Sequence, residues 1–155
     1  GGGTGSVSIE AAGLSENITV YTIEQKEEAF ALIEENKKKS GLENIKVIRG
    51  AAPEAMQDLP VPTHAFIGGS GGKLKEILNV LYQKNPKMRV VINAISLETI
   101  SELNMILEEY PVQNEEIIQM QVNRTKKAGK YHLMQAENPV WICSFAFGEE
   151  RENED

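Results

Sequence analysis

Short apolar runs alternate with helix-like stretches four times along this chain, and this alternation limits the possible folds more than any other feature. The runs at residues 18–23 and 89–95 are rich in β-branched residues, which favour strands. Helical spacing of apolar residues follows each of them, over residues 25–39 and 97–109. Strands that alternate with helices form a mostly parallel sheet, so the sequence predicts an α/β fold.

Two further runs, at residues 116–122 and 140–147, have no helical stretch between them. They predict an antiparallel pair that closes the sheet. At the other end of the chain, the short helix predicted over residues 6–12 needs a strand that leads into it, and none precedes Gly1. We therefore expect that the first strand of the fold is missing from this sequence.

Two glycine-rich turns interrupt the alternation. Residues 1–5 read Gly-Gly-Gly-Thr-Gly, and residues 68–72 read Gly-Gly-Ser-Gly-Gly between a strand at 63–67 and a helix at 73–83. Glycine adopts positive φ and lets a ligand approach the backbone, and a helix N-terminus presents unpaired N–H groups. The first turn is one residue shorter than the dinucleotide-binding pattern G-x-G-x-x-G. A glycine-rich N-terminus also fits a flexible tail or an expression remnant.

Charged residues occur at three informative places. Glu24 ends a strand about twenty residues after the first glycine turn, where α/β folds place an acid that binds ribose hydroxyls. Residues 37–39 are three lysines at a predicted helix C-terminus, where cations complement the helix dipole. Residues 123–132 form a basic loop in an otherwise acidic protein, which either binds carboxylates or is an ordinary solvated hairpin.

Composition narrows the class of protein. The chain has 155 residues, of which 41% are hydrophobic, and this suits one domain, expected over residues 1–148, with an acidic tail at 149–155. The net charge of −7 argues against a nucleic-acid partner. No apolar run approaches the ~20 residues of a membrane helix. A single cysteine, Cys143, excludes an internal disulfide and favours the cytoplasm.

Five blocks give the chain a family resemblance: residues 1–7, 20–24, 52–55 (Ala-Pro-Glu-Ala), 67–72 (Ile-Gly-Gly-Ser-Gly-Gly) and 138–140 (Asn-Pro-Val). They resemble the CbiT type of cobalt-precorrin/precorrin carbon-15 methyltransferase (decarboxylating), which is also the C-terminal half of CobL fusions. The resemblance implies a Rossmann-like class I methyltransferase fold that depends on S-adenosylmethionine (SAM), with a mostly parallel seven-stranded sheet and a C-terminal antiparallel hairpin. It also implies methylation of a tetrapyrrole at carbon 15, with decarboxylation of an acetate side chain, in cobalamin biosynthesis.

The resemblance assigns site residues one by one. Those expected to bind SAM are Gly1, Gly2, Gly3, Thr4, Gly5, Glu24, Ala51, Ala52 and Gly68. Those expected near the tetrapyrrole are Gly69, Ser70, Gly71, Gly72, Asn93, Arg124, Lys130 and His132. Ala51 departs from the family pattern, in which an Asp is common and contacts the adenine. Of the glycines in the second turn, Gly71 is expected to give the cleaner test of acceptor binding, because Gly69 lies closer to the donor.

No catalytic residue and no metal site is assigned. A macrocycle carbon conjugated to ring nitrogens is already a nucleophile, and the macrocycle itself takes up the electrons released by decarboxylation. His64, Cys143 and Trp141 are interpreted as structural. Expected partners are further copies of the chain in a homotetramer, with Ile118, Met120 and Val122 as interface material, and a carbon-5 methyltransferase, fused or separate. The alternatives are a methyltransferase for another substrate, such as RNA, and a nucleotide-binding module without catalysis.

Overall fold

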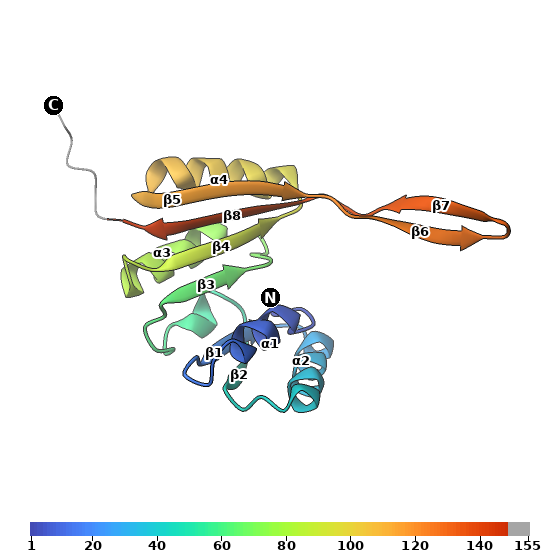
Figure 1. Cartoon of the computed structure of the whole chain (residues 1–155). Helices are drawn as coiled ribbons and strands as arrows, with labels where there is room; N and C mark the ends of the chain where they lie inside the picture. Colours follow the sequence, from blue (N-terminus) through green and yellow to red (C-terminus); the bar gives the residue numbers. More distant parts are fainter. Residues whose placement is uncertain (149–155) are drawn as a thin grey trace.

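The computed structural model describes residues 1–148, so the expected acidic tail at 149–155 lies outside the described residues. The chain begins with α1 (Ser6–Gly13), followed by the parallel strands β1 (Val20–Glu24) and β2 (Ile45–Arg49) with α2 (Glu27–Ser40) between them. Gly41, in the left-handed conformation at φ 70°, ends α2. Together with the first glycine turn, these elements form one half of the molecule (Figure 1).

The second half holds the larger sheet. The strands β3 (His64–Ile67) and β4 (Arg89–Ala94) pair in parallel, and α3 (Leu74–Lys84) connects them. A single 3₁₀ turn, η1 (Glu54–Met56), precedes β3. Ser96 caps the following helix, since its side chain accepts a hydrogen bond from the Thr99 N–H.

That following helix is α4 (Leu97–Glu109), and two antiparallel strands come after it: β5 (Val112–Met120) and β8 (Val140–Phe147). The order of the larger sheet is β3-β4-β8-β5, so the predicted antiparallel closure is confirmed. The predicted start of β5, at residue 116, was late. An irregularity between Gln113 and Glu116 interrupts the pairing of β5 with β8. It breaks the alternation of side chains along β5, so the sequence pattern does not predict the first residues of this strand.

The α/β class is confirmed, but the strands do not form one continuous seven-stranded sheet. Within residues 1–148, β1 and β2 form a two-stranded sheet of their own, separate from the four-stranded sheet. β1 and β3 are not hydrogen-bonded to each other, so the predicted single sheet is divided at this point in the described part of the chain.

One apolar core holds α3 and α4 against the larger sheet. Leu74, Leu78, Val90 and Phe145 are completely buried in it. Burial of each such side chain contributes about 1.5–3 kcal/mol relative to exposure. Between residues 1 and 148, no helix is long and apolar enough to span a membrane.

The basic stretch at 123–132 belongs to a β-hairpin, which was one of the two alternatives for this stretch. Its strands are β6 (Asn123–Ala128) and β7 (Tyr131–Ala136), and the hairpin extends away from the rest of the molecule (Figure 1). Every residue of both strands is exposed. Because neither face is buried, the sequence carries no alternation of apolar and polar residues that would predict strands.

Candidate functional site

The first glycine turn is a tightly packed connection. The Gly2 N–H donates to the Ile23 carbonyl (2.9 Å) and the Gly5 N–H to the Gly2 carbonyl (2.9 Å). A Cβ on Gly2 would lie 2.7 Å from Ile33 Cδ1, and one on Gly5, at φ 78°, 3.1 Å from Ile33 Cγ2. Gly3 differs, because it has φ 59° but no atom within 4 Å of an added Cβ. These contacts fit a folded turn with open space at Gly3, not a flexible tail.

Glu24 ties this turn to the end of β1. Its carboxylate accepts hydrogen bonds from the backbone N–H of Gly3 (3.1 Å) and of Lys26 (2.9 Å). Only 4% of the residue is exposed. Burial by itself raises the pKa of the Glu24 carboxyl, but the backbone hydrogen bonds from Lys26, Gly3 and Gln25, together with the positive charge on the Gly1 nitrogen, outweigh it and the pKa is lowered. The lowered pKa keeps Glu24 ionised at neutral pH. A carboxylate has about four acceptor positions, so two backbone hydrogen bonds leave positions for a ligand's hydroxyls.

Ala51 and Ala52 lie beside Glu24 at the end of the neighbouring strand. The Gly50 N–H donates to the Glu24 carbonyl oxygen (3.0 Å), which brings the end of β2 against the end of β1. The Ala51 carbonyl accepts from the Ala55 N–H (2.8 Å). Both alanines are half-buried. Thr4 is held as well, because its carbonyl accepts from Asn36 Nδ2 (2.9 Å).

The second glycine turn meets the first. The nitrogen of Gly1 donates to the Gly69 carbonyl (3.3 Å), so the two turns are adjacent, as the sequence predicts. Added Cβ atoms on Gly69, Gly71 and Gly72 would meet nothing within 4 Å. Gly71 and Gly72 have φ of 59° and 81°, whereas Gly69 does not need a positive φ. The contact with Gly1 agrees with the expectation that Gly69 lies closer to the donor. A side chain at Gly71 would also strain the backbone, so a substitution there tests more than acceptor binding.

A cavity of about 290 Å³ lies under the second turn, at the carboxyl ends of β3 and β4. Asn93, near the end of β4, is one of its lining residues, and Asn93 Oδ1 is buried without a hydrogen-bond donor. Ligands of open α/β sheets bind at this edge. The structure thus brings Gly68, Gly69, Ser70, Gly71, Gly72 and Asn93 together.

Sequence reasoning missed three further features of this region. Ile95 and Thr99 line the cavity, and the Phe66 ring lies 3.1 Å from the position of a Cβ on Gly68. Ile95 is 68% exposed, and in the sequence it continues the apolar run of the strand, so no signal separated it from the core residues before it. The ion pair of Lys73 Nζ with Glu54 Oε1 (2.9 Å) joins the second turn to η1. The spacing of these two residues in the sequence does not predict this pair.

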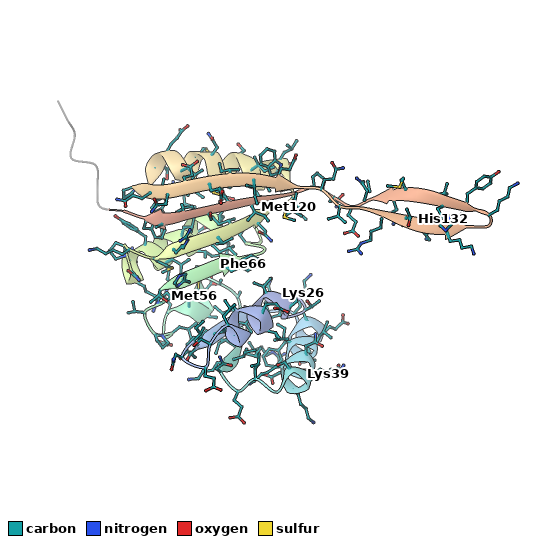
Figure 2. All side chains as sticks on the ribbon, in the orientation of Figure 1. Lys26, Lys39, Met56, Phe66, Met120 and His132 are labelled. Carbon is teal, nitrogen blue, oxygen red and sulfur yellow. The ribbon has the colours of Figure 1, made fainter. Side chains whose placement is uncertain are left out.

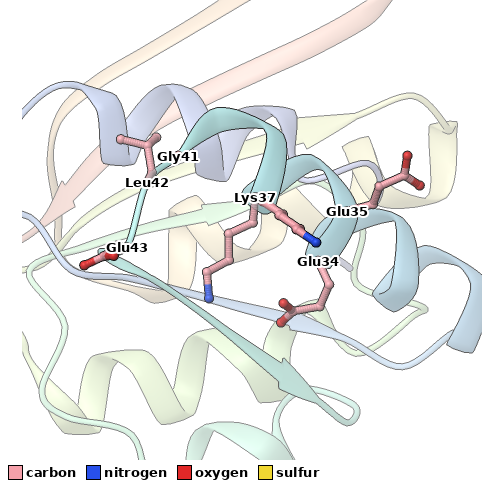
Figure 3. Close-up of a pocket in the computed structure, with 7 residues that line it drawn as sticks. Glu34, Glu35, Lys37, Gly41, Leu42 and Glu43 are labelled. Carbon is pink, nitrogen blue, oxygen red and sulfur yellow. The ribbon is translucent and has the colours of Figure 1, made fainter.

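A larger hollow of about 650 Å³ lies elsewhere, around the C-terminal half of α2 (Figure 3). The first glycine turn contacts the middle of α2 through Ile33 and Asn36, and the hollow lies on the side chains next to them, toward the C-terminal end of this helix. The hollow is lined by exposed Glu and Lys side chains and by Gly41 and Leu42. Lys39 pairs with Glu35 (2.6 Å), which fits the predicted structural role of these lysines.

Arg124, Lys130 and His132 are not brought to the glycine turns. They lie on the projecting hairpin. Phe66 lies beside the second turn, and Figure 2 shows His132 far from Phe66. Arg124 pairs with Glu137 (2.5 Å) at the base of the hairpin. Cys143 is buried, and its surroundings raise the pKa of the thiol to about 11, chiefly through desolvation. This agrees with a structural role for Cys143.

The fold and the site together define a class I methyltransferase architecture. A SAM-dependent O-methyltransferase from Thermotoga maritima superposes with a TM-score of 0.75 over 98% of this chain and 58% of its own, at 16% identity, which shows the fold alone. A family model described as "Precorrin methyltransferase domain" matches residues 1–146. The chain belongs to this precorrin methyltransferase family.

Named relatives agree with that membership. A probable cobalt-precorrin-6B C(15)-methyltransferase (decarboxylating) from Pyrobaculum calidifontis is 35% identical over 93% of this chain and 74% of its own length. The crystal structure of precorrin-6y C5,15-methyltransferase from Geobacter metallireducens superposes with a TM-score of 0.85, at 33% identity, over 94% of this chain and 77% of its own. A precorrin 8w decarboxylase from Methanobacterium thermoautotrophicum gives a TM-score of 0.80, also at 33% identity, with the same two coverages.

Proposed function

We propose that this protein transfers a methyl group from SAM to carbon 15 of a precorrin or cobalt-precorrin and removes an acetate carboxyl group of the same molecule, in cobalamin biosynthesis. The chain belongs to the precorrin methyltransferase family. The observation that carries the proposal is the contact between its two glycine turns, of which the first is closely packed and the second is open. Relatives named for C(15) methylation and for decarboxylation support both parts of the reaction. They also favour this function over RNA methylation or binding without catalysis.

The residues of the first turn fit SAM. Gly3 leaves open space beside the turn, and Glu24 keeps acceptor positions for the two ribose hydroxyls. Ala51 and Ala52 would border the adenine, and Gly68 would face the donor from the next strand. When bound, SAM supplies an electrophilic methyl group on a sulfonium.

The chain's own contribution to methyl transfer is positioning. In-line displacement depends on holding donor and acceptor at the correct distance and angle. The first turn would fix the donor, while the open second turn, residues 68–72, leaves room for a flat macrocycle. The lining of the cavity beneath it contains no His, Lys, Asp or Glu, which agrees with an acceptor carbon that needs no enzymic base.

The cations of the hairpin point to assembly. Arg124, Lys126, Lys127 and Lys130 give residues 123–136 a charge of +4, so the remainder of the chain, at −11, is strongly acidic. A two-stranded hairpin is marginally stable alone in water, yet Leu133 and Met134 are exposed on it. We infer that it docks on further copies in a homotetramer, where Arg124, Lys130 and His132 would reach a neighbour's tetrapyrrole carboxylates. Ile118, Met120 and Val122, also exposed, would extend the interface.

Light scattering checks the assembly. The wild type should be tetrameric at micromolar concentration, and Leu133→Lys with Met134→Lys should dissociate it, because buried lysines lose hydration. Gln135→Lys is the matched control on the same strand. A monomeric wild type would contradict the inference.

We further propose that the protein acts in the cytoplasm beside a carbon-5 methyltransferase, fused or separate. The name of the relative from Geobacter metallireducens, a C5,15-methyltransferase, supports the pairing.

A mass assay tests the function. The protein is incubated with SAM and either a precorrin or its cobalt complex. The expected product has gained one methyl group and lost one carboxyl group. Stoichiometric SAM binding without turnover on either tetrapyrrole would overturn the proposal.

A further inference from the structure

The cavity under the second glycine turn is too small for a whole tetrapyrrole. Its volume is about 290 Å³, whereas pockets that enclose drug-sized ligands measure about 300–1,000 Å³. A macrocycle bound against residues 68–72 can therefore insert only an edge or one side chain.

The lining selects what that side chain can be. Ile67 and Ile92 are buried and apolar, and Ser70, Asn93 and Thr99 supply its polar side chains, none of them charged. The Thr99 hydroxyl already bonds to the Ser96 hydroxyl (3.1 Å). A carboxylate in this cavity would meet no cation, because no Lys, Arg or His lines it.

Asn93 is a polar residue of the cavity whose side chain lacks a hydrogen-bond partner. Its Oδ1 is the buried side-chain oxygen or nitrogen that stays unsatisfied within residues 1–148, and no hydrogen bond from its amide NH2 is found there. The buried Oδ1 is out of a ligand's reach, whereas the NH2 is accessible and makes no hydrogen bond within the described residues. A donor without a partner, on the lining of a cavity at the edge where ligands bind, suits an acceptor such as a carboxylate.

We propose that this cavity receives the acetate side chain that is lost as CO2, and that the Asn93 NH2 donates a hydrogen bond to its carboxylate. The inference rests on the proposed function. Asn93 would orient the carboxylate without neutralising it, whereas a Lys or Arg would stabilise the charged ground state. Apolar walls such as Ile67 and Ile92 favour loss of that charge as neutral CO2.

The step balances with one molecule of water. The bond between the acetate CH2 and its carboxyl carbon breaks, and the carboxyl group leaves as CO2. The electron pair of that bond delocalises into the conjugated macrocycle. It returns to the CH2 carbon when that carbon takes one proton from water, so a methyl group forms and hydroxide is left.

Asn93→Leu tests the assignment, because leucine has a similar size and cannot donate a hydrogen bond. In the mass assay, the variant should still transfer the methyl group, and decarboxylation should slow by about tenfold or more. A methylated product that retains its carboxyl group should accumulate. Asn104→Leu, the same change at an exposed position of α4, should behave as wild type.

A second variant keeps the test independent of folding. Asn93→Asp should repel the acetate when ionised and donate to it when protonated, so its decarboxylation rate should recover as the assay goes from about pH 8 to about pH 6. Equal rates of both steps in Asn93→Leu and wild type, or an equal fall of both steps, would overturn the inference. A wild type that methylates no tetrapyrrole would instead overturn the proposed function.

Discussion

The two glycine turns are alike in composition and opposite in packing. In the first, side chains on Gly2 or Gly5 would collide with Ile33, so the glycines are needed to close the turn against α2. In the second, side chains on Gly69, Gly71 or Gly72 would meet nothing within 4 Å. Glycine therefore serves the protein's own packing at one turn, while at the other it leaves space for another molecule. The comparison teaches that a glycine-rich pattern identifies a function only once the space beside it is known.

Breaking the first turn should give the largest effect. Gly5→Ala combines a positive φ with a close contact to Ile33, and should lower the free energy of unfolding by about 2–4 kcal/mol. Gly3→Ala is the matched variant, because it carries a similar φ without the contact, and should lower it by about 1–2 kcal/mol. Urea unfolding measures both. Equal losses in the two variants would show that packing at Gly5 is unimportant.

Filling the second turn should spare stability and abolish turnover. Gly69→Val should change the free energy of unfolding by less than about 0.5 kcal/mol, yet slow methyl transfer about a hundredfold or more because the acceptor is displaced. SAM affinity, measured by calorimetry, should stay within about threefold of wild type. Gly13→Val, another glycine with open space around it, is the control. Wild-type turnover in Gly69→Val would make the second turn a simple connection.

Sequence patterns predicted the parts of the molecule where burial is one-sided or complete. The helix at 97–109 and the strand at 140–147 have the bounds predicted for them, because apolar periodicity reports which face is covered. The contact of Gly1 with Gly69 follows from the carboxyl ends of parallel strands sharing one edge. Both glycine turns were therefore foreseeable as one site.

The remainder depended on contacts that no periodicity encodes. All residues of β6 and β7 are exposed, so an extended hairpin and a loop have the same sequence pattern. The positive φ of Asn114 interrupts the start of β5 in a similar way. That Asn93 Oδ1 lacks a partner depends on every surrounding atom, and the pairing of Lys73 with Glu54 joins residues far apart in the chain.

Glu24 connects the first turn to its ligand, and its removal should weaken SAM binding. Glu24→Ala should reduce the binding free energy by about 1–3 kcal/mol, because the ribose hydroxyls lose a charged acceptor. The loss of the hydrogen bonds to the Gly3 and Lys26 N–H groups adds to the effect. Calorimetry measures it, with Glu35→Ala on α2 as the control. Unchanged affinity in Glu24→Ala would remove Glu24 from the donor site.

The smallest effect should appear in the pH dependence of the first turn. The lowered pKa of Glu24 means that its stabilising contribution is present above the unfolded-state pKa of about 4.3. The contribution is lost as the pH falls through the lower pKa of the folded protein, because the unfolded chain then binds the proton more readily. Glu24→Gln cannot ionise, so the gap in unfolding free energy between wild type and variant should be constant near neutral pH and shrink below about pH 4. Urea unfolding at several pH values measures this gap. A gap that widens in acid would mean that burial, not the hydrogen bonds from Gly3 and Lys26, dominates the carboxylate. The first turn would then be held by its packing against Ile33 and by its other hydrogen bonds, such as that of Gly2 with Ile23.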